Sequence, residues 1–292
     1  MKNKIILCIT LLCITTFICS CQLLGITKKP NPTPSPTSVI NGSLPEMCIH
    51  VIDVGQGDAI LVDFGNDELL IDGNHGYKLC GYLADCVDGD IEEMVATHPH
   101  ADHISGLIDV LGVFKVDNIW TNGVNEVSKT YTDFIDAANK DAAIMHTAKR
   151  GDTIIVGGYT FSVLNPPSTL FGDTNEDSIV LKLVYGKFVF QFEGDAGVDA
   201  EASMRSAGLL SKIDVLKVGH HGSVTASSAD FISIVSPSIA VYTAGVGNSY
   251  GLPDEEIITR LTNSGATIYG TDINGSVVIC TDGNTISVQT EK

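Results

Sequence analysis

Basic residues are scarce in this chain. Its 292 residues include 17 Lys and Arg but 35 Asp and Glu, which gives a net charge of −18. The first 20 residues hold two Lys and no acidic residue, so the rest carries a net charge of −20. Such a surface repels polyphosphate and lacks the basic footprint that binds long duplex DNA. Long nucleic acid is therefore disfavoured as a partner, whereas a small phosphodiester is not, because bound metal ions would supply local positive charge.

The chain also lacks an apolar run long enough for a comfortable membrane span. Residues 5–19 are uncharged and apolar and follow Lys2 and Lys4, which is the pattern of a secretory signal. The run ends in Ile-Cys-Ser-Cys, which resembles a bacterial lipobox. We predict that residues 1–20 are a lipoprotein signal peptide and that Cys21 is the lipidated N-terminus. Cys19 as the lipidated residue and an uncleaved membrane anchor are the alternatives. All of these place the remaining chain outside the cytoplasmic membrane, lipid-anchored on its outer face in the favoured interpretation.

Proline is concentrated in one short segment. Four prolines between positions 30 and 36 exclude helix and central strand, so residues 21–46 are predicted to be the lipidated Cys and an extended tether. Residues 47–292 contain no second break of this kind and no internal repeat, which predicts one large domain. No basic patch or further domain indicates a protein partner.

Cysteines are few after the predicted tether, and Cys48, Cys80, Cys86 and Cys280 are not spaced as metal ligands. An exported location permits disulfides. Cys80 and Cys86 are close enough in sequence for a local bridge, although a chain of this length does not need one. That pairing is left open.

The segment His98-Pro-His-Ala-Asp-His103 places four metal-ligating side chains within six residues. It joins a strand-like run to a helix-like run from Ile104, which predicts a strand-to-helix loop. Alternate residues of an extended segment point the same way, so His98 and His100 can bind one ion. Asp102 and His103 lie where the helix begins and can face a second ion. Imidazole with carboxylate suits zinc, and also manganese or iron where carboxylates are plentiful.

Strand-like and helix-like patterns alternate along both halves of the chain. In the first half we predict strands at 47–54, 59–64, 68–72 and 92–97 and near Trp120, helices from 104 and at 129–141, and helix or loop at 76–87. In the second half we predict strands at 154–156, 159–164, 179–185, 187–193, 215–218, 239–243, 267–269, 276–280 and 285–289, and helices at 199–210, 229–235 and 254–264. This order predicts an α/β chain with two sheets face to face and helices outside.

Two later segments place ligand residues directly after a predicted strand. Asp195 follows the strand at 187–193, and His220 and His221 follow the strand at 215–218. Alone, such an Asp is usually a turn former. Downstream of a metal motif, each of these residues becomes a candidate ligand at the same edge of the sandwich.

Seven segments together match one known family: Asp53–Asp58, Leu70–Gly73, Thr97–His103, Gly194–Asp195, Leu216–Ser223, Asn248–Gly251 and Thr271–Gly275. They resemble the metallo-β-lactamase fold and, within it, the extracytoplasmic domain of ComEC-type competence proteins and their stand-alone relatives. The resemblance covers residues 48–279. It implies a four-layer αββα sandwich, two divalent metal ions in a cleft at the sheet edge, and hydrolytic chemistry.

The resemblance also implies a role for each matching residue. Six residues would bind the ions: His98 and His100 the first, Asp102 and His103 the second, Asp195 both, and His221 the second. Asp72 would orient a ligand His from behind, and Asp58 belongs to a signature interpreted as mainly structural. Asp102 and His220 are the catalytic candidates, with His220 or a water as proton donor to the leaving group. Ser223 and Tyr250 are candidates for binding the substrate.

The chain departs from the family at two places. Many members of the wider fold supply a third His to the first metal, but the one His between the cluster and Asp195 is His146, which we predict to be an ordinary strand or loop residue. The ComEC-type segment 175–178 lies in that interval instead, and its Asp177 is a candidate contact to the first metal, direct or through water. Leu252 stands where the subgroup usually has His, which removes an expected substrate or acid role.

A metal-dependent hydrolase of a phosphodiester is the favoured function, because the related proteins act on nucleic acid or on phosphorylated cell-wall decorations. The substrate would be a small molecule or a cell-envelope ester, and the metal zinc or alternatively manganese. A carboxylic ester or lactone hydrolase is one alternative, and a non-catalytic binding module with a structural metal is another. The bridging Asp195 opposes the binding module, because a purely structural zinc site has no open position.

Overall fold

The computed structural model describes residues 44–292. The predictions of a signal peptide, of lipidation at Cys21 and of most of the tether fall on residues 1–43 and lie outside the described residues. Strand β1 begins at Met47, where the large domain is predicted to begin. Within residues 44–292, no helix combines the length and the apolar character needed to cross a membrane.

The described strands form two sheets. The first has the order β15-β14-β1-β2-β3-β4-β5-β6 and comprises β1 (Met47–Val51), β2 (Ile60–Asp63), β3 (Glu68–Ile71), β4 (Ile91–Ala96), β5 (Val116–Thr121), β6 (Ile144–Thr147), β14 (Val277–Thr281) and β15 (Ile286–Thr290). The second has the order β13-β12-β11-β10-β9-β8-β7 and comprises β7 (Thr153–Val156), β8 (Tyr159–Asn165), β9 (Val180–Tyr185), β10 (Phe188–Phe192), β11 (Val215–Lys217), β12 (Ile239–Tyr242) and β13 (Thr267–Gly270).

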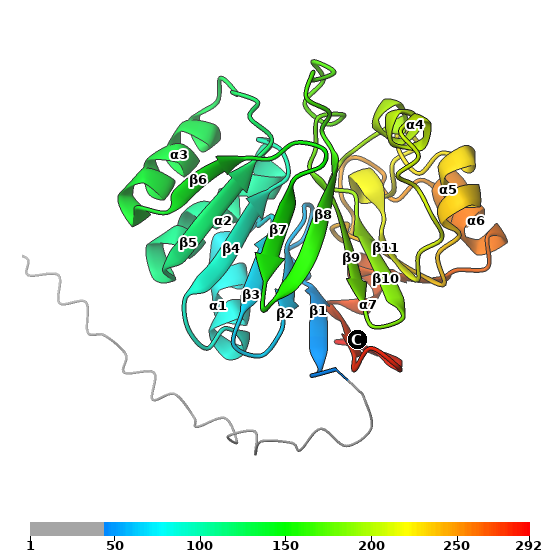
Figure 1. The fold of residues 1–292 in the computed structure, drawn as a ribbon, viewed down its shortest axis with the longest axis horizontal. Helices are drawn as coiled ribbons and strands as arrows, with labels where there is room; N and C mark the ends of the chain where they lie inside the picture. Colours follow the sequence, from blue (N-terminus) through cyan, green and yellow to red (C-terminus); the bar gives the residue numbers. More distant parts are fainter. Residues whose placement is uncertain (1–43) are drawn as a thin grey trace, which may run out of the picture. The chain divides into compact units, whose positions relative to one another are not determined.

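Helices cover the outer face of each sheet, as Figure 1 shows. On the first sheet these are α1 (Gly76–Cys86), α2 (Ala101–Val113) and α3 (Lys129–Asp141), and on the second α4 (Val198–Ser206), α5 (Ala229–Val235) and α6 (Glu255–Asn263). The short helices η1 (Gly219–Gly222) and α7 (Thr271–Asn274) lie in connections. The predicted four-layer αββα sandwich is thereby confirmed.

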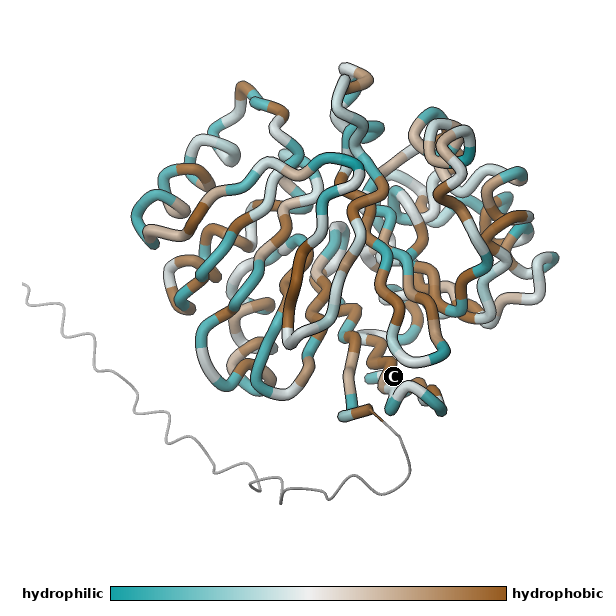
Figure 2. Tube along the Cα trace, in the orientation of Figure 1, coloured by the Kyte–Doolittle hydropathy of each residue, from teal (hydrophilic) through white to brown (hydrophobic). Residues whose placement is uncertain are grey.

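Side-chain alternation along the strands explains this packing. In β1, Met47, Ile49 and Val51 are buried between the sheets, while Cys48 and His50 point to the other face. Apolar residues of both sheets form one core between them, and the outer faces pack against the helices in separate clusters. Figure 2 shows the apolar stretches running along the central strands.

Strand direction determines where the candidate ligands lie. Strands β3 to β6 are parallel, and so are β10 to β13. The carboxyl ends of parallel strands meet at one edge, where ligand sites of such sheets usually lie. Asp72 follows β3, His98 follows β4, Asp195 follows β10 and His221 follows β11. The described chain begins at the opposite end, where the Leu44 amide donates to the Asp282 carbonyl at 3.0 Å.

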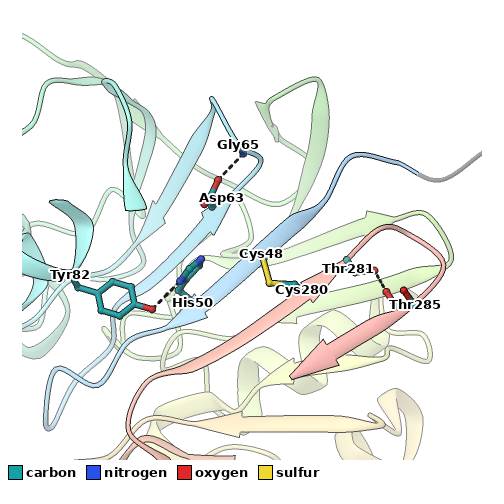
Figure 3. Close-up of a disulfide and its surroundings, with 8 residues drawn as sticks. All are labelled: Cys48, His50, Asp63, Gly65, Tyr82, Cys280, Thr281 and Thr285. Atoms are coloured by element: carbon teal, nitrogen blue, oxygen red, sulfur yellow. Dashed lines mark hydrogen bonds between the residues drawn. A yellow bond between two sulfur atoms is a disulfide. The ribbon is translucent and has the colours of Figure 1, made fainter. Parts of the chain in front are cut away.

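The disulfide differs from the candidate pairing. Cys48 and Cys280 lie opposite each other on antiparallel β1 and β14 and are bonded, as Figure 3 shows, whereas Cys80 and Cys86 are free. The Cys80–Cys86 pairing, which the sequence leaves open, is therefore not formed. Both of its cysteines lie on α1, where six positions correspond to ~9 Å along the axis and to different faces of the helix.

Most predicted elements match the structure within one to three residues at each end. Residues 76–87, left as helix or loop, form α1, and the helix predicted at 199–210 ends at Ser206. Gly208 has a φ of 71°, a left-handed conformation that glycine adopts readily at helix ends. Residues 144–147 form the edge strand β6, which agrees with the prediction that His146 lies in a strand or loop.

Candidate metal centre

Asp195 lies at the centre of the site. Its Oδ2 is 3.3 Å from Nε2 of His103, 3.6 Å from that of His221, and 3.7 Å from those of His98 and His220. The Asp195 side chain is 3% exposed, and its amide is bonded to Ser178 Oγ at 3.2 Å. A buried carboxylate surrounded by four imidazole nitrogens is placed as the predicted bridging ligand would be.

The residues of the His98–His103 segment approach Asp195 from β4 and the start of α2. His98, His103 and Asp195 form one group whose ligand atoms lie within 4.8 Å of one another, and Asp102, His103 and His221 form another. Asp102 Oδ2 is 3.4 Å from His221 Nε2. His100 lies beside His98, with 3.0 Å between His100 Nδ1 and His98 Nε2, but it completes no such group of three.

Asp72 supports His103 from behind, as expected from the resemblance. Its side chain is fully buried and accepts from His103 Nδ1 at 2.8 Å, and from the amide and hydroxyl of Thr97 at 2.7 Å each. With its Nδ1 proton donated to Asp72, His103 presents the Nε2 lone pair to Asp195 and to an ion.

Asp58 does the same for His221, a role the sequence interpretation missed. Asp58 Oδ1 is 3.3 Å from His221 Nδ1 and accepts from the Thr243 hydroxyl, while Oδ2 is 2.8 Å from Lys217 Nζ. Asp58 also falls geometrically within groups that could hold an ion. Both of its oxygens are engaged and a lysine ammonium adjoins it, so we assign Asp58 to support and not to ligation.

Backbone strain is concentrated at this edge. Asp72, His220 and His221 have φ values of 58°, 47° and 54°, and they account for three of the seven non-glycine residues with positive φ in the described chain. Such conformations cost about 1–3 kcal/mol each and persist where surrounding structure fixes them, often at functional sites. Here they direct His220 and His221 toward Asp195, and Asp72 toward His103.

The residues present fit divalent metal ions. Three buried ligand atoms have no hydrogen-bond partner within residues 44–292: His103 Nε2, His221 Nε2 and Asp195 Oδ1. Buried polar atoms without partners are rare in proteins, because their desolvation is uncompensated. All three atoms belong to imidazole or carboxylate groups, the donors that zinc and manganese accept.

The electrostatics of the site favour a cation. Burial alone would raise the pKa of Asp195, yet His103, His221 and His98 hold that pKa well below its usual value. Burial would likewise lower the pKa of His221, but Asp195, Asp102 and Asp58 raise it to about 9. Carboxylates that favour positive charge on these imidazoles also favour a metal ion in place of the protons.

Other predicted site residues lie at the rim or outside it. His220 is 25% exposed, and its Nδ1 is 2.7 Å from the Thr225 hydroxyl, which donates to Ser223 Oγ at 3.0 Å. Tyr250 is 73% exposed in the β12–α6 connection. Asp177 does not join a metal-capable group, because its carboxylate accepts from two backbone amides of its own loop, at 2.8 and 3.1 Å.

His146 lies away from the centre. It stacks on Trp120 with 4.3 Å between ring centroids and approaches Asn118 Oδ1 to 3.0 Å through Nε2. It therefore does not replace the missing third His of the wider fold, in agreement with its predicted role.

Residues 49–245 match the sequence pattern of the metallo-beta-lactamase superfamily. The chain belongs to this superfamily. Its members are usually metal-dependent hydrolases, and the fold implies divalent ions, often two. The matched range contains every residue of the centre, from Asp58 to Thr243.

Curated relatives confirm the resemblance to ComEC-type proteins. ComE operon protein 3 of Bacillus subtilis is 26% identical over 250 residues, covering 78% of this chain and 32% of that protein. Competence protein ComA of Neisseria gonorrhoeae is 29% identical over 238 residues, covering 80% and 32%. Recombination protein 2 of Haemophilus influenzae is 27% identical over 243 residues, covering 80% and 29%. The chain thus spans about a third of the length of these relatives.

Solved structures share the fold at low sequence identity. The metallo-beta-lactamase fold protein YhfI of Bacillus subtilis has a TM-score of 0.53 and 13% identity, covering 77% of this chain and 96% of that one. CmlA, a diiron beta-hydroxylase from Streptomyces venezuelae, also has a TM-score of 0.53, with 12% identity and coverage of 76% and 52%. A hydroxylase on this fold shows that the reaction must be argued from the site.

Proposed function

We propose that this protein is a metal-dependent hydrolase that binds two divalent ions and cleaves a phosphodiester. The observation that carries the proposal is the position of Asp195. Its Oδ2 lies within 3.7 Å of four imidazole nitrogens, while its buried Oδ1 has no hydrogen-bond partner among residues 44–292. A single structural ion would need only four donors and would leave no position for a substrate.

Different residues would bind the two ions, according to where they lie around Asp195. His98, with His100 beside it, would hold the ion on the β4 side, Asp102 and His221 the ion on the β11 side, and His103 and Asp195 lie between them. Bound divalent ions supply Lewis acidity and make water nucleophilic near neutral pH. The protein fixes the ligands through Asp72 and Asp58, so little reorganisation is needed during reaction.

His220 is the proposed proton donor to the leaving group in its doubly protonated form, which burial disfavours by lowering the pKa of the ring. It is the most exposed imidazole around Asp195, and the Thr225 hydroxyl at 2.7 Å fixes its Nδ1. Its Nε2 therefore faces the centre, 3.7 Å from Asp195 Oδ2 and 3.5 Å from the Asn175 side-chain nitrogen. The proposed substrate contacts are Ser223, which accepts from Thr225, and the exposed Tyr250 of the β12–α6 connection.

A phosphodiester is the substrate class to test first. One relative is named a competence protein and another a recombination protein, which directs attention to nucleic-acid esters, while the acidic chain favours a small or cell-envelope ester over a long polyanion. Hydrolysis of bis(p-nitrophenyl) phosphate by the full-length protein, measured with zinc or with manganese, tests the proposal. His98→Ala should abolish turnover, whereas His146→Ala, a histidine outside the centre, should retain it.

The other outcomes identify the alternatives. Two bound ions without diester turnover would direct the search to carboxylic esters and lactones. One tightly bound ion, or none, without turnover would indicate a non-catalytic binding module. Normal diester turnover by metal-free His98→Ala would refute the metal-dependent mechanism.

We further propose that the protein is exported and held on the outer face of the cytoplasmic membrane through Cys21. The apolar run at residues 5–19, which follows Lys2 and Lys4 and ends in Ile-Cys-Ser-Cys, supports this proposal. Fractionation of wild type and Cys21→Ala tests this: the variant should lose membrane association, and its retention in the membrane would refute lipidation at Cys21.

A further inference from the structure

Lys217 is the one Lys or Arg that is buried in the described part of the chain. It lies at the end of β11 between apolar residues, and its side chain is 1% exposed. Its Nζ is 2.8 Å from Asp58 Oδ2 and donates to the Val218 carbonyl at 2.9 Å. A lysine is rarely buried without a reason, because its charge must be desolvated and paired.

The ion pair ends at His221. Asp58 Oδ1, the oxygen not paired with Lys217, lies 3.3 Å from His221 Nδ1, and the Thr243 hydroxyl contacts both of these atoms. With Nδ1 directed at a carboxylate, His221 carries its proton there and keeps the Nε2 lone pair free. That Nε2 is the atom 3.4 Å from Asp102 Oδ2.

The Asp58 backbone is tied to the same place. Its amide donates to the Asp102 carbonyl at 3.2 Å, so one residue contacts both the turn that carries Asp102 and the ring of His221. The metal-capable group Asp102, His103 and His221 is therefore held by Asp58 from two sides.

The two supporting carboxylates are not equivalent. Asp72, behind His103, is satisfied by the Thr97 amide and hydroxyl and by His103 itself, and no Lys or Arg of the described chain pairs with it. Asp58, behind His221, is paired with a full positive charge. Removal of Lys217 would leave Asp58 Oδ2 without its ion-pair partner and weaken the hold on the carboxylate, so only the His221 side depends on the lysine.

We propose that the buried Lys217–Asp58 pair is a positioning device that fixes the ring and tautomer of His221 and thereby sets the metal affinity of the Asp102–His103–His221 group. Neither member of the pair binds the ion. The inference rests on the metal centre of the proposed function but not on its substrate. Metal binding therefore tests it even if phosphodiester cleavage fails.

The test is metal stoichiometry and affinity of the full-length protein, measured by equilibrium dialysis with zinc alone. Lys217→Met together with Asp58→Leu removes both charges and leaves no unpaired one, so the variant should fold. We expect the wild type to bind two zinc ions. The double variant should keep one ion at wild-type affinity and bind the other with a dissociation constant raised about 10- to 100-fold. That is the usual effect of losing a residue that orients a metal ligand. Lys217→Arg keeps the charge and should retain both ions.

A control variant and a second test variant distinguish an effect on the orientation of His221 from an effect on folding. Lys182→Met removes another strand lysine, whose Nζ donates to the Leu209 carbonyl at 3.1 Å outside the centre, and should leave both ions bound. Thr243→Val leaves the ion pair intact but removes the hydroxyl shared by Asp58 and His221. It should raise the same dissociation constant by about 2- to 10-fold, and it reports on positioning even if the double variant does not fold.

Three results would overturn the inference. A folded double variant with two ions at wild-type affinity would show that the pair only stabilises the fold. Loss of both ions from that folded variant would show that the effect is not confined to the His221 side. Wild-type zinc affinity in Thr243→Val would show that the contacts to His221 Nδ1 do not govern binding.

Discussion

Asp72→Asn replaces one carboxylate oxygen by an amino group. It tests whether Asp72 acts by orienting the ligand His103. In the wild type, Asp72 Oδ1 accepts from the Thr97 amide, and Oδ2 accepts from the Thr97 hydroxyl and from His103 Nδ1. Asn can place only one oxygen. If that oxygen faces the Thr97 amide, the new NH₂ faces His103 Nδ1 and moves the histidine proton to Nε2, which can then no longer bind an ion.

The opposite orientation of the new side-chain amide also has a cost. Its oxygen would then accept from His103, but its NH₂ would face the fixed Thr97 amide, leaving a buried donor unpaired at about 1–3 kcal/mol. The protein should adopt whichever arrangement costs less. We therefore expect unfolding free energy to fall by about 1–3 kcal/mol and zinc affinity to fall about 10- to 100-fold.

Urea unfolding of the metal-free protein and zinc competition measure the two effects separately. Asp214→Asn is the matched control, because Asp214 Oδ2 accepts from the Val189 amide at 2.8 Å in a strand connection outside the centre. Its remaining oxygen can still accept from the Val189 amide, so both stability and zinc affinity should stay close to wild type. Wild-type zinc affinity in Asp72→Asn would refute the assignment of Asp72 to the support of His103.

Three further changes test other parts of the molecule. Burial, and then repulsion from neighbouring carboxylates, raise the pKa of Glu68 to about 8 from 4.5. The folded state thus retains a proton that the unfolded state has released. The free energy of unfolding should therefore fall as the pH rises from 5 to 8, and urea titrations of Glu68→Gln should not show that fall. Reduction of Cys48–Cys280, which are 232 residues apart, should lower unfolding free energy by about 2–5 kcal/mol and leave zinc binding unchanged. Gly57→Ala would place a Cβ in collision with the Asp102 carbonyl oxygen at a φ of 131°, so zinc titration should show weakened binding.

The position of the centre could be predicted because it follows from strand order. Each ligand stretch comes directly after an apolar strand, and parallel strands bring their carboxyl ends to the same edge. Asp72, Asp195 and His221 therefore meet although they are far apart in sequence. The His98–His103 motif needed no fold at all, since its four ligand residues are neighbours in the chain.

What could not be predicted depends on which strands become neighbours. The Cys48–Cys280 bond requires β14 to pair with β1, which the local sequence does not reveal, and from sequence the nearer Cys80 and Cys86 are only an open possibility. The position of Lys217 in the sequence does predict a buried ion pair. A strand buried on both faces is normally a continuous apolar run, so a lysine between Leu216 and Val218 implied a buried anion nearby, and the structure identifies that anion as Asp58.

The same pair bears on how an acidic protein could attract an anionic substrate. Asp72, Asp102 and Asp195 contribute three negative charges at the centre, whereas Asp58 is neutralised by Lys217. Under the proposed loading with two divalent ions, the centre carries one positive charge when its histidines are neutral, within a chain of net charge −18. That sign suits a single diester anion at short range, while a long polyanion still meets the acidic surface. Without the lysine, the fourth carboxylate would cancel that charge, so under this proposal Lys217 would contribute to substrate attraction as well as to the geometry of His221.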